Sequence, residues 1–282
     1  MTVRIVSVLG AGTMGHGIAH ASAGAGYGTR LYDVSDAQLG RARGQIDGIF
    51  RKSVELGKAT AADADAGIAR LETTSDLGHA LAGTDFVIEA APERLEVKLA
   101  LFADIERFAP ETAVVGSNTS ALSVTELAGS LRAPGRVAGM HFFNPVHKMK
   151  LVEIVRALES TVDTLETIEQ VAHRMGKQTV SVRESPGFIT TRVNASIGNE
   201  AFYMLMEGVA SARDIDKALT LGLNHPMGPF ELVDLVGLDT RLSILEYLHR
   251  SLGEKYRPCP LLAQYVKAGR LGKKVGRGVY DY

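Results

Sequence analysis

Short runs of β-branched and other apolar residues alternate with longer amphipathic stretches through the first two-thirds of the chain. The short runs are typical of buried strands, and the stretches between them have helical spacing. This alternation predicts a doubly wound α/β domain, in which helices cover a mostly parallel sheet. The expected strands are 3–9, 29–33, 86–90, 113–117, 137–141, 151–155 and 178–182, and the expected helices are 14–26, 37–57, 61–71, 96–108, 123–129 and 164–175.

One pair of expected strands departs from this alternation. Only nine residues separate 137–141 from 151–155, which is too few for a crossover helix. An antiparallel pair is therefore expected. It places His141 on one strand near Glu153 on the other.

After the last expected strand the chain becomes almost wholly helical. Apolar residues recur every three or four positions from Phe188 to Leu205 and predict one apolar helix face. Ser211–Asp214 resembles a capping box, and Pro229 suits a first helical turn. We place the domain boundary near Arg183, which gives an α/β domain at 1–183, with a helical insert at about 37–75, and a helical domain at 184–282.

Composition narrows the functional classes. Of the 282 residues, 45% are hydrophobic and 22% are charged, as in ordinary globular proteins, and the net charge of −1 does not favour a nucleic-acid or membrane surface. The N-terminus lacks the features of a signal peptide, and no apolar run is long enough for a membrane span. The single cysteine, Cys259, is expected to be packed and inert. We therefore expect a cytoplasmic protein.

A glycine-rich turn follows the first expected strand and opens the first helix. Gly10-Ala11-Gly12-Thr13-Met14-Gly15 has the spacing of the dinucleotide-binding fingerprint of Rossmann-type domains. Asp33 ends the second strand, where a carboxylate accepts hydrogen bonds from an adenosine ribose and repels a 2′-phosphate. This predicts NAD(H) in preference to NADP(H). A glycine turn beside a surface aspartate is the competing interpretation, and flavoproteins and nucleotide-binding sensors share the fingerprint.

A possible catalytic group lies further along the chain. Histidine exchanges protons near neutral pH, so His141 is a candidate general base. Glu153 is a candidate partner that fixes the imidazole tautomer and stabilises its protonated form. A purely structural pair has the same spacing. The neighbouring Asn144-Pro145 and the upstream Ser117–Ser120 favour the catalytic interpretation.

These motifs together make the chain similar to the 3-hydroxyacyl-CoA dehydrogenases, and most similar to their short-chain 3-hydroxybutyryl-CoA branch. The matching segments keep the family's order along essentially the whole chain. They are Gly10–Gly15, Ser117–Ser120, His141–Pro145, Leu151–Val155, Ser185–Phe188, Asn224–Pro229, Lys255–Pro258 and Gly276–Tyr282.

The resemblance implies a role for several residues. His141 matches the general base that removes the 3-hydroxyl proton, and Glu153 matches its carboxylate partner. Ser120 and Asn144 match groups that contact the substrate. A further set matches positions that contact the cofactor, namely Glu93, Lys98 and Asn118. For Ser120 a helix cap is an alternative, and for Glu93 and Lys98 a solvated helix start is an alternative.

The resemblance also bears on the acyl-CoA substrate and on assembly. Thr191 stands where many members carry an asparagine in the substrate pocket, which puts the acyl preference in doubt. Arg51, Lys52 and Lys58 in the helical insert are candidates for holding the CoA phosphates, with a solvated helix face as the alternative. The family pattern implies a homodimer through the helical domain. The absence of an attached hydratase domain favours a short acyl group such as 3-hydroxybutyryl.

Other functions share parts of this pattern. Related dehydrogenases act on free 3-hydroxy acids such as carnitine or gulonate, and these enzymes would not need the basic insert. A non-catalytic NAD-binding sensor would not need His141 and Glu153. The 6-phosphogluconate-type dehydrogenases share the glycine pattern but use a lysine on a long helix, for which we find no matching segment.

Overall fold

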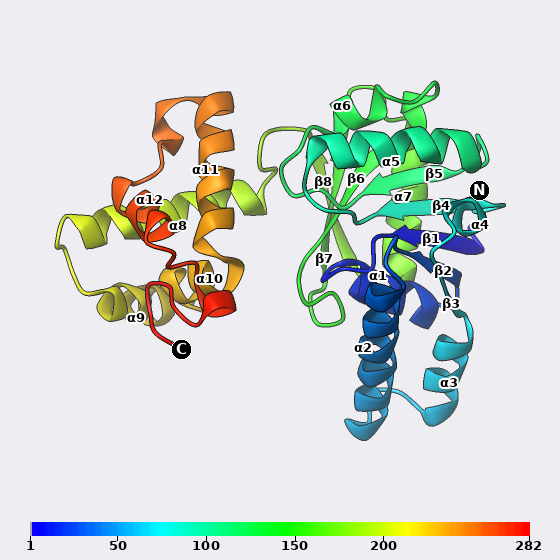
Figure 1. The fold of residues 1–282 in the computed structure, drawn as a ribbon, viewed down its shortest axis with the longest axis horizontal. Helices are drawn as coiled ribbons and strands as arrows, with labels where there is room; N and C mark the ends of the chain where they lie inside the picture. The colour runs from blue at the N-terminus through cyan, green and yellow to red at the C-terminus, as the bar shows by residue number, and fades with distance from the viewer. Residues whose placement is uncertain (1) are drawn as a thin grey trace. The chain divides into compact units, whose positions relative to one another are not determined.

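The computed structural model describes residues 2–282, which form two compact units. The first unit runs to Glu184, and the second unit spans Ser185–Tyr282 (Figure 1). No helix within residues 2–282 is both long enough and apolar enough to cross a membrane.

An eight-stranded sheet forms the centre of the first unit, with strand order β3-β2-β1-β4-β5-β6-β7-β8. All neighbouring strands are parallel except β6 and β7, which are antiparallel as the sequence predicts. The doubly wound α/β fold class is thereby confirmed. The strands are β1 (Ile5–Leu9), β2 (Gly28–Tyr32), β3 (Leu71–Thr74), β4 (Phe86–Glu89), β5 (Val114–Ser117), β6 (Val137–Phe142), β7 (Leu151–Arg156) and β8 (Gln178–Arg183).

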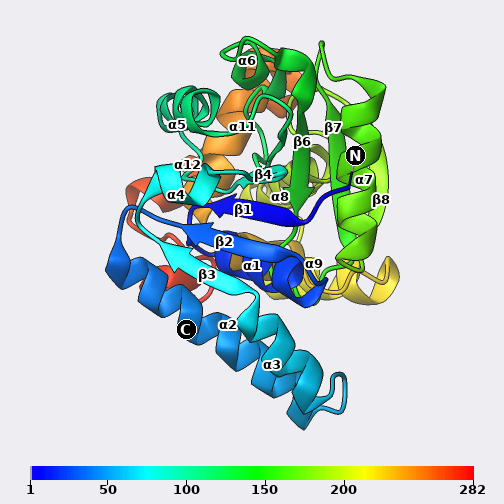
Figure 2. The same ribbon diagram turned by 90° about the vertical axis from the view of Figure 1, so that its right-hand side faces the viewer.

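Helices cover both faces of this sheet (Figures 1 and 2). Buried apolar side chains of α1 and α7 share one hydrophobic core with β1, β4, β6 and β7. The helices α4, α5 and α6 lie over the opposite face, while α2 and α3 run side by side as an arm (Figure 2). The helix bounds are α1 (Gly15–Gly24), α2 (Asp36–Glu55), α3 (Ala61–Ala69), α4 (Leu77–Leu81), α5 (Leu95–Phe108), α6 (Val124–Ala128) and α7 (Val162–Arg174).

The strand β3 and the helix α4 were not predicted from the sequence. The expected helix 61–71 ends at Ala69, and the chain turns directly into β3. This strand is short, and only Leu71 of its four residues is buried, so its apolar signal is weak. The five-residue helix α4 is equally brief, and its start is marked by Asp76, whose side chain accepts a hydrogen bond from the His79 amide.

The second unit consists of helices around its own apolar core. Ser211 caps α9, and Pro229 begins α10, as predicted. Along the first helix of this unit Val193 is 54% exposed while Ala195 and Phe202 are fully buried, so its apolar residues are divided between surface and core. Cys259 is buried within this core, as expected. The helices are α8 (Thr190–Met206), α9 (Ala212–Gly222), α10 (Pro229–Val236), α11 (Leu238–Leu252) and α12 (Pro260–Lys267).

Candidate active site

The glycine-rich turn between β1 and α1 has the steric properties of a phosphate-binding loop. A Cβ atom on Gly10 would lie 2.6 Å from the Ala90 carbonyl oxygen, and one on Gly15 would lie 1.7 Å from the Gly10 carbonyl oxygen. A Cβ on Gly12 would meet no atom of residues 2–282 within 4 Å. Gly10 and Gly15 are therefore required for packing, whereas the space beside Gly12 suits the close approach of a ligand.

Asp33 follows β2 and lies beside this turn. Its Oδ2 accepts a hydrogen bond of 2.9 Å from the Ala11 amide, and its Oδ1 accepts one of 3.0 Å from the Ser35 amide. The carboxylate is thus held next to the loop, at the carboxyl end of the parallel strands. This is where a dinucleotide ribose lies in folds of this class.

The strand pair β6–β7 brings His141 and Glu153 together. The two residues are directly opposite in the ladder, and His141 Nδ1 lies 2.7 Å from Glu153 Oε2. His141 is 5% exposed and Glu153 is fully buried. An ionised carboxylate only accepts hydrogen bonds, so Nδ1 donates, and Nε2 is the basic nitrogen of the neutral ring. The pair has the geometry of a general base with an orienting carboxylate.

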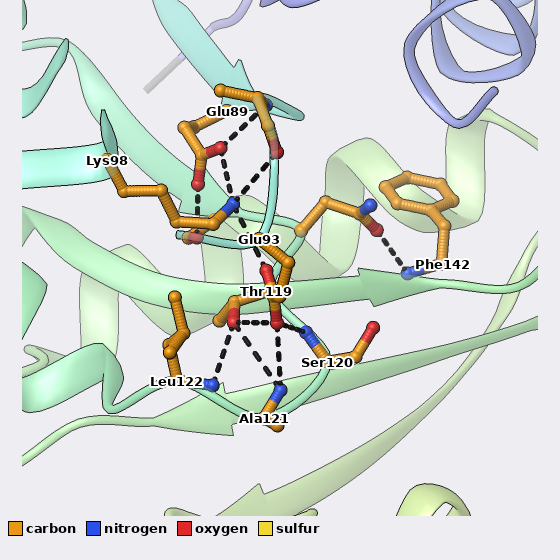
Figure 3. A network of polar contacts seen from close by, with 11 residues as sticks. Glu89, Glu93, Lys98, Thr119, Ser120, Ala121, Leu122 and Phe142 are labelled. Atoms are coloured by element: carbon orange, nitrogen blue, oxygen red, sulfur yellow. Dashed lines mark hydrogen bonds and ion pairs between the residues drawn. The ribbon is translucent and has the colours of Figure 1, made fainter. Parts of the chain in front are cut away.

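The loop that carries Ser120 is held by Glu93. One carboxylate oxygen of Glu93 accepts hydrogen bonds from the Thr119 hydroxyl at 2.7 Å, from the Ser120 amide at 2.7 Å and from the Ala121 amide at 3.1 Å (Figure 3). Ser120 itself is half-buried. Ser120 does not cap the next helix. The cap of α6 is Ser123, whose hydroxyl accepts the hydrogen bond at the start of that helix.

Lys98 is not part of a solvated helix start, because it is fully buried. Its Nζ lies 2.6 Å from an oxygen of Glu89 and 3.4 Å from an oxygen of Glu93 (Figure 3). Sequence reasoning missed Glu89. The available signal was its position at the end of Phe86-Val87-Ile88, where a charged residue continues a fully apolar strand.

The remaining predicted site residues fall into two groups. Asn118 lies next to the β6 strand end, because its Oδ1 accepts a 2.8 Å hydrogen bond from the Phe142 amide. Asn144 is exposed just after β6 and precedes a cis peptide bond to Pro145. The other group lies on other elements of the chain. Arg51 and Lys52 are exposed on α2, Lys58 is exposed just after it, and Thr191 is half-buried on α8 of the second unit.

A second histidine that the sequence did not single out, His20, lies on α1. Its ring packs 4.2 Å from the Phe50 ring and 6.4 Å from the His147 ring, measured between centroids. Both ring nitrogens are buried and lack a hydrogen-bond partner among residues 2–282. Burial, followed by the charges of His147, Lys177 and His16, lowers the pKa of His20 to about 4. The ring is therefore neutral at physiological pH.

Known proteins resemble this chain along its whole length. Residues 5–185 match the NAD binding domain of 3-hydroxyacyl-CoA dehydrogenase, and residues 187–282 match its C-terminal domain. A probable 3-hydroxybutyryl-CoA dehydrogenase of Bacillus subtilis (strain 168) is 46% identical, over 100% of this chain and 98% of that protein. A 3-hydroxyadipyl-CoA dehydrogenase of Escherichia coli (strain K12) is 43% identical, over 100% of this chain and 60% of that protein.

A solved structure shows the same arrangement. The crystal structure of (S)-3-hydroxybutyryl-CoA dehydrogenase from Ralstonia eutropha aligns with a TM-score of 0.96 and 40% identity, covering 100% of this chain and 99% of that one. Both family domains are thus matched in chain order, and the fold agrees over the full length. The chain belongs to the 3-hydroxyacyl-CoA dehydrogenase family.

Proposed function

We propose that this enzyme reversibly oxidises an (S)-3-hydroxyacyl-CoA to the 3-oxoacyl-CoA with NAD as the hydride acceptor. The observation that carries the proposal is the buried hydrogen bond of 2.7 Å between His141 Nδ1 and Glu153 Oε2. His141 Nε2 takes the proton of the 3-hydroxyl group as the hydride leaves C3. Glu153 stabilises the imidazolium that forms and keeps the ring in the required orientation.

Substrate orientation is the second part of the proposal. The Ser120 hydroxyl donates a hydrogen bond to the substrate oxygen at C3, and Asn144 lines the same pocket. Glu93 supports this role, because it holds the Ser120 and Ala121 amides in place. A serine on a well-held loop lowers the barrier mainly by orientation.

The residues around the glycine-rich turn fit a dinucleotide. Gly12 faces open space, the N-terminus of α1 lies next to it, and Asp33 stands at the end of β2. In our proposal the backbone of residues 10–15 binds the pyrophosphate and Asp33 binds the adenosine ribose. Glu93, Lys98 and Asn118 border the nicotinamide side.

NAD is preferred over NADP in this proposal because the Asp33 carboxylate repels a 2′-phosphate. We expect Asp33→Asn to reduce the ratio of kcat/KM for NAD to kcat/KM for NADP by about tenfold. This corresponds to roughly 1.4 kcal/mol in the difference between the two activation free energies. Asparagine keeps an acceptor oxygen for the Ala11 amide, so the loop is retained. Steady-state kinetics with both cofactors measures the ratio, and an unchanged ratio would remove Asp33 from this role.

The CoA phosphates are proposed to bind basic residues of the α2–α3 arm. Arg51, Lys52 and Lys58 are exposed. The pKa of the His147 ring is lowered by burial, then by the charges of Lys148, His16 and Lys177, and least by Lys58, which is close enough to contribute. Lys52 is already paired with Glu55 at 2.8 Å, which makes it the weakest of the three candidates. Raised ionic strength should therefore increase the KM for the CoA thioester more than the KM for NAD.

The acyl group is proposed to be short, with 3-hydroxybutyryl-CoA as the first candidate. Relatives at 46% and 43% identity carry butyryl and adipyl names, so overall identity does not separate these substrates. Rates with 3-oxoacyl-CoAs from C4 to C10, with 3-oxoadipyl-CoA and with free 3-oxo acids would separate them. Maximal kcat/KM on a free acid would contradict the CoA proposal.

We also propose a homodimer formed through the second unit. Ile197, Met204 and Leu223 line a hollow of about 450 Å³ in that unit, and Leu223 is 67% exposed. Apolar side chains at such a surface favour association. Sedimentation analysis should give about twice the 30.1 kDa chain mass, and Leu223→Glu should shift the protein toward the monomer.

A further inference from the structure

Glu89 is a buried carboxylate to which neither the sequence nor the proposed reaction assigns a role. It ends β4 and is fully buried. Its side chain accepts three hydrogen bonds, from the Ser117 hydroxyl at 2.6 Å, from Lys98 Nζ at 2.6 Å and from the Ala91 amide at 2.7 Å (Figure 3). A carboxylate with this many partners is fixed in one orientation.

Lys98 connects Glu89 to the loop that carries Ser120. Its side chain is 1% exposed, and its ammonium group lies between Glu89, at 2.6 Å, and Glu93, at 3.4 Å. Glu93 in turn accepts the Ser120 and Ala121 amides. A continuous series of charged contacts therefore runs from the centre of the sheet to the backbone of Ser120.

Glu89 is also connected to the strand that carries His141. Its backbone oxygen accepts a 2.8 Å hydrogen bond from the Asn118 amide, and the Asn118 side chain accepts one from the Phe142 amide. Glu89 is opposite Ser117, and Ser117 is opposite Gly139, in neighbouring ladders. His141 lies two residues after Gly139 on β6, and side chains two residues apart on a strand point to the same face. Glu89 and His141 therefore point to the same face of the sheet.

We propose that Glu89 is a positioning residue for the dehydrogenase reaction. Through Lys98 and Glu93 it fixes the loop of Ser120, while its main chain and Asn118 tie that loop to the strand end of His141. The serine hydroxyl and the base are thereby kept at a constant separation. The inference rests on the proposed roles of Ser120 and His141 but assigns Glu89 no contact with substrate.

A purely structural role for Glu89 makes a different prediction. Removing one partner of a buried ion pair leaves an uncompensated charge and destabilises a protein strongly, whereas replacing both partners is often neutral. If Glu89 serves only stability, the Ser120 and Ala121 amides should stay held once charge balance is restored. If it positions the loop, stability returns but these amides remain loosely held, because Glu93 is without its ammonium neighbour.

The test compares Glu89→Gln, Lys98→Met, the double variant Glu89→Gln/Lys98→Met, and Glu93→Gln. We expect each of the first two variants to lower both the Tm and kcat. The double variant should recover most of the lost Tm while its kcat stays at least tenfold below wild type, because small misplacements of reacting groups cost about 10- to 100-fold. Glu93→Gln should reproduce the kcat loss with little change in Tm, since its side chain is 41% exposed.

Glu96→Gln is the matched control. Glu96 lies on α5, the helix that carries Lys98, and is 65% exposed. It pairs only with Arg94 among the described residues, so this variant should behave as wild type. A double variant with wild-type kcat would overturn the proposal.

Hydrogen exchange of the Ser120 and Ala121 amides supplies a readout that does not depend on turnover. These amides should exchange at least tenfold faster in the double variant than in wild type and Glu96→Gln. Unchanged exchange would overturn the proposal even if the wild-type protein proved inactive on 3-hydroxyacyl-CoA. Inactivity of the wild type combined with faster exchange would instead count against the proposed function alone.

Discussion

His141 and His20 are two histidines of the first unit whose ring nitrogens lie away from solvent in opposite surroundings. His141 faces a carboxylate, with Nδ1 at 2.7 Å from Glu153 Oε2. His20 has no carboxylate partner among residues 2–282, and its charged neighbours are His16 on the same helix, His147 and Lys177. The remaining packed group, the Phe50 ring, carries no charge.

The difference shows that burial alone does not make a histidine a base. A buried imidazole accepts a proton only where an opposite charge stabilises the product. Glu153 supplies that charge to His141. At His20, burial and then the cationic neighbours favour the neutral ring and lower its pKa to about 4. The first environment suits proton exchange, and the second suits only packing.

The largest expected effect comes from removing the base. His141→Gln should lower kcat by about 1,000-fold, within the range of a lost general base, because glutamine cannot take the hydroxyl proton. The dissociation constant for NAD, measured by fluorescence titration, should change less than threefold, roughly 0.6 kcal/mol. His20→Leu is the control and should retain kcat. Similar losses from both variants would end the contrast between the two histidines.

The pH dependence of protein stability tests the environment of His20. The pKa of His20 in the folded protein is about 4, below the ordinary value of 6.5. Between pH 4 and pH 6.5 the unfolded chain therefore binds a proton at this ring that the folded protein does not bind. Stability should therefore fall as the pH decreases from 6.5 to 4, by about 3 kcal/mol from this group. Denaturant unfolding of His20→Leu should lack this component of the decline.

His173 provides the matched control for that measurement. Its side chain is 54% exposed, so His173→Leu should keep the acid-dependent loss of stability seen in wild type. An identical decline in wild type and His20→Leu would show that His20 is not held neutral by its surroundings.

Glu153→Gln should have a smaller effect on catalysis than loss of the base. The amide still occupies the site opposite His141 but does not stabilise the imidazolium, so kcat should fall by about 30-fold, roughly 2 kcal/mol. Rates measured across pH 6–9 would show whether the loss depends on pH. A variant as impaired as His141→Gln would show that the charge of Glu153 is as necessary as the base itself.

The smallest expected effect comes from removing one cation near His20. His147→Ala should raise the pKa of His20 from about 4 toward 6.5 by a fraction of a unit, since burial is the larger cause of the shift. Nuclear magnetic resonance titration of the His20 ring measures this change. An unshifted or lowered pKa would mean that His147 does not act on His20.

The sequence allowed the sheet and the closeness of His141 to Glu153 to be predicted because both depend on local patterns. Buried strands are continuous apolar runs, and the nine-residue connection between two of them excludes a crossover helix. From these two facts the closeness of His141 and Glu153 follows, and the ladder confirms it. The short strand Leu71–Thr74 was missed because three of its four residues are not buried.

The contacts of Glu89 and His20 were not predictable in the same way. Lys98 reaches Glu89 from a helix nine residues later, and Ser117 approaches from the next strand. His147 approaches His20 from a loop more than a hundred residues away. Such contacts depend on tertiary packing, and a single sequence shows only that an unusual polar residue stands in an apolar run.

The ladder between β6 and β7 fixes how His141 and Glu153 face each other. Main-chain pairing sets the register of Gly139–Phe142 against Val152–Val155, and this register alone places His141 opposite Glu153. The connecting segment 143–150 does not have to set that distance. A change in the length of this segment should therefore leave His141 opposite Glu153.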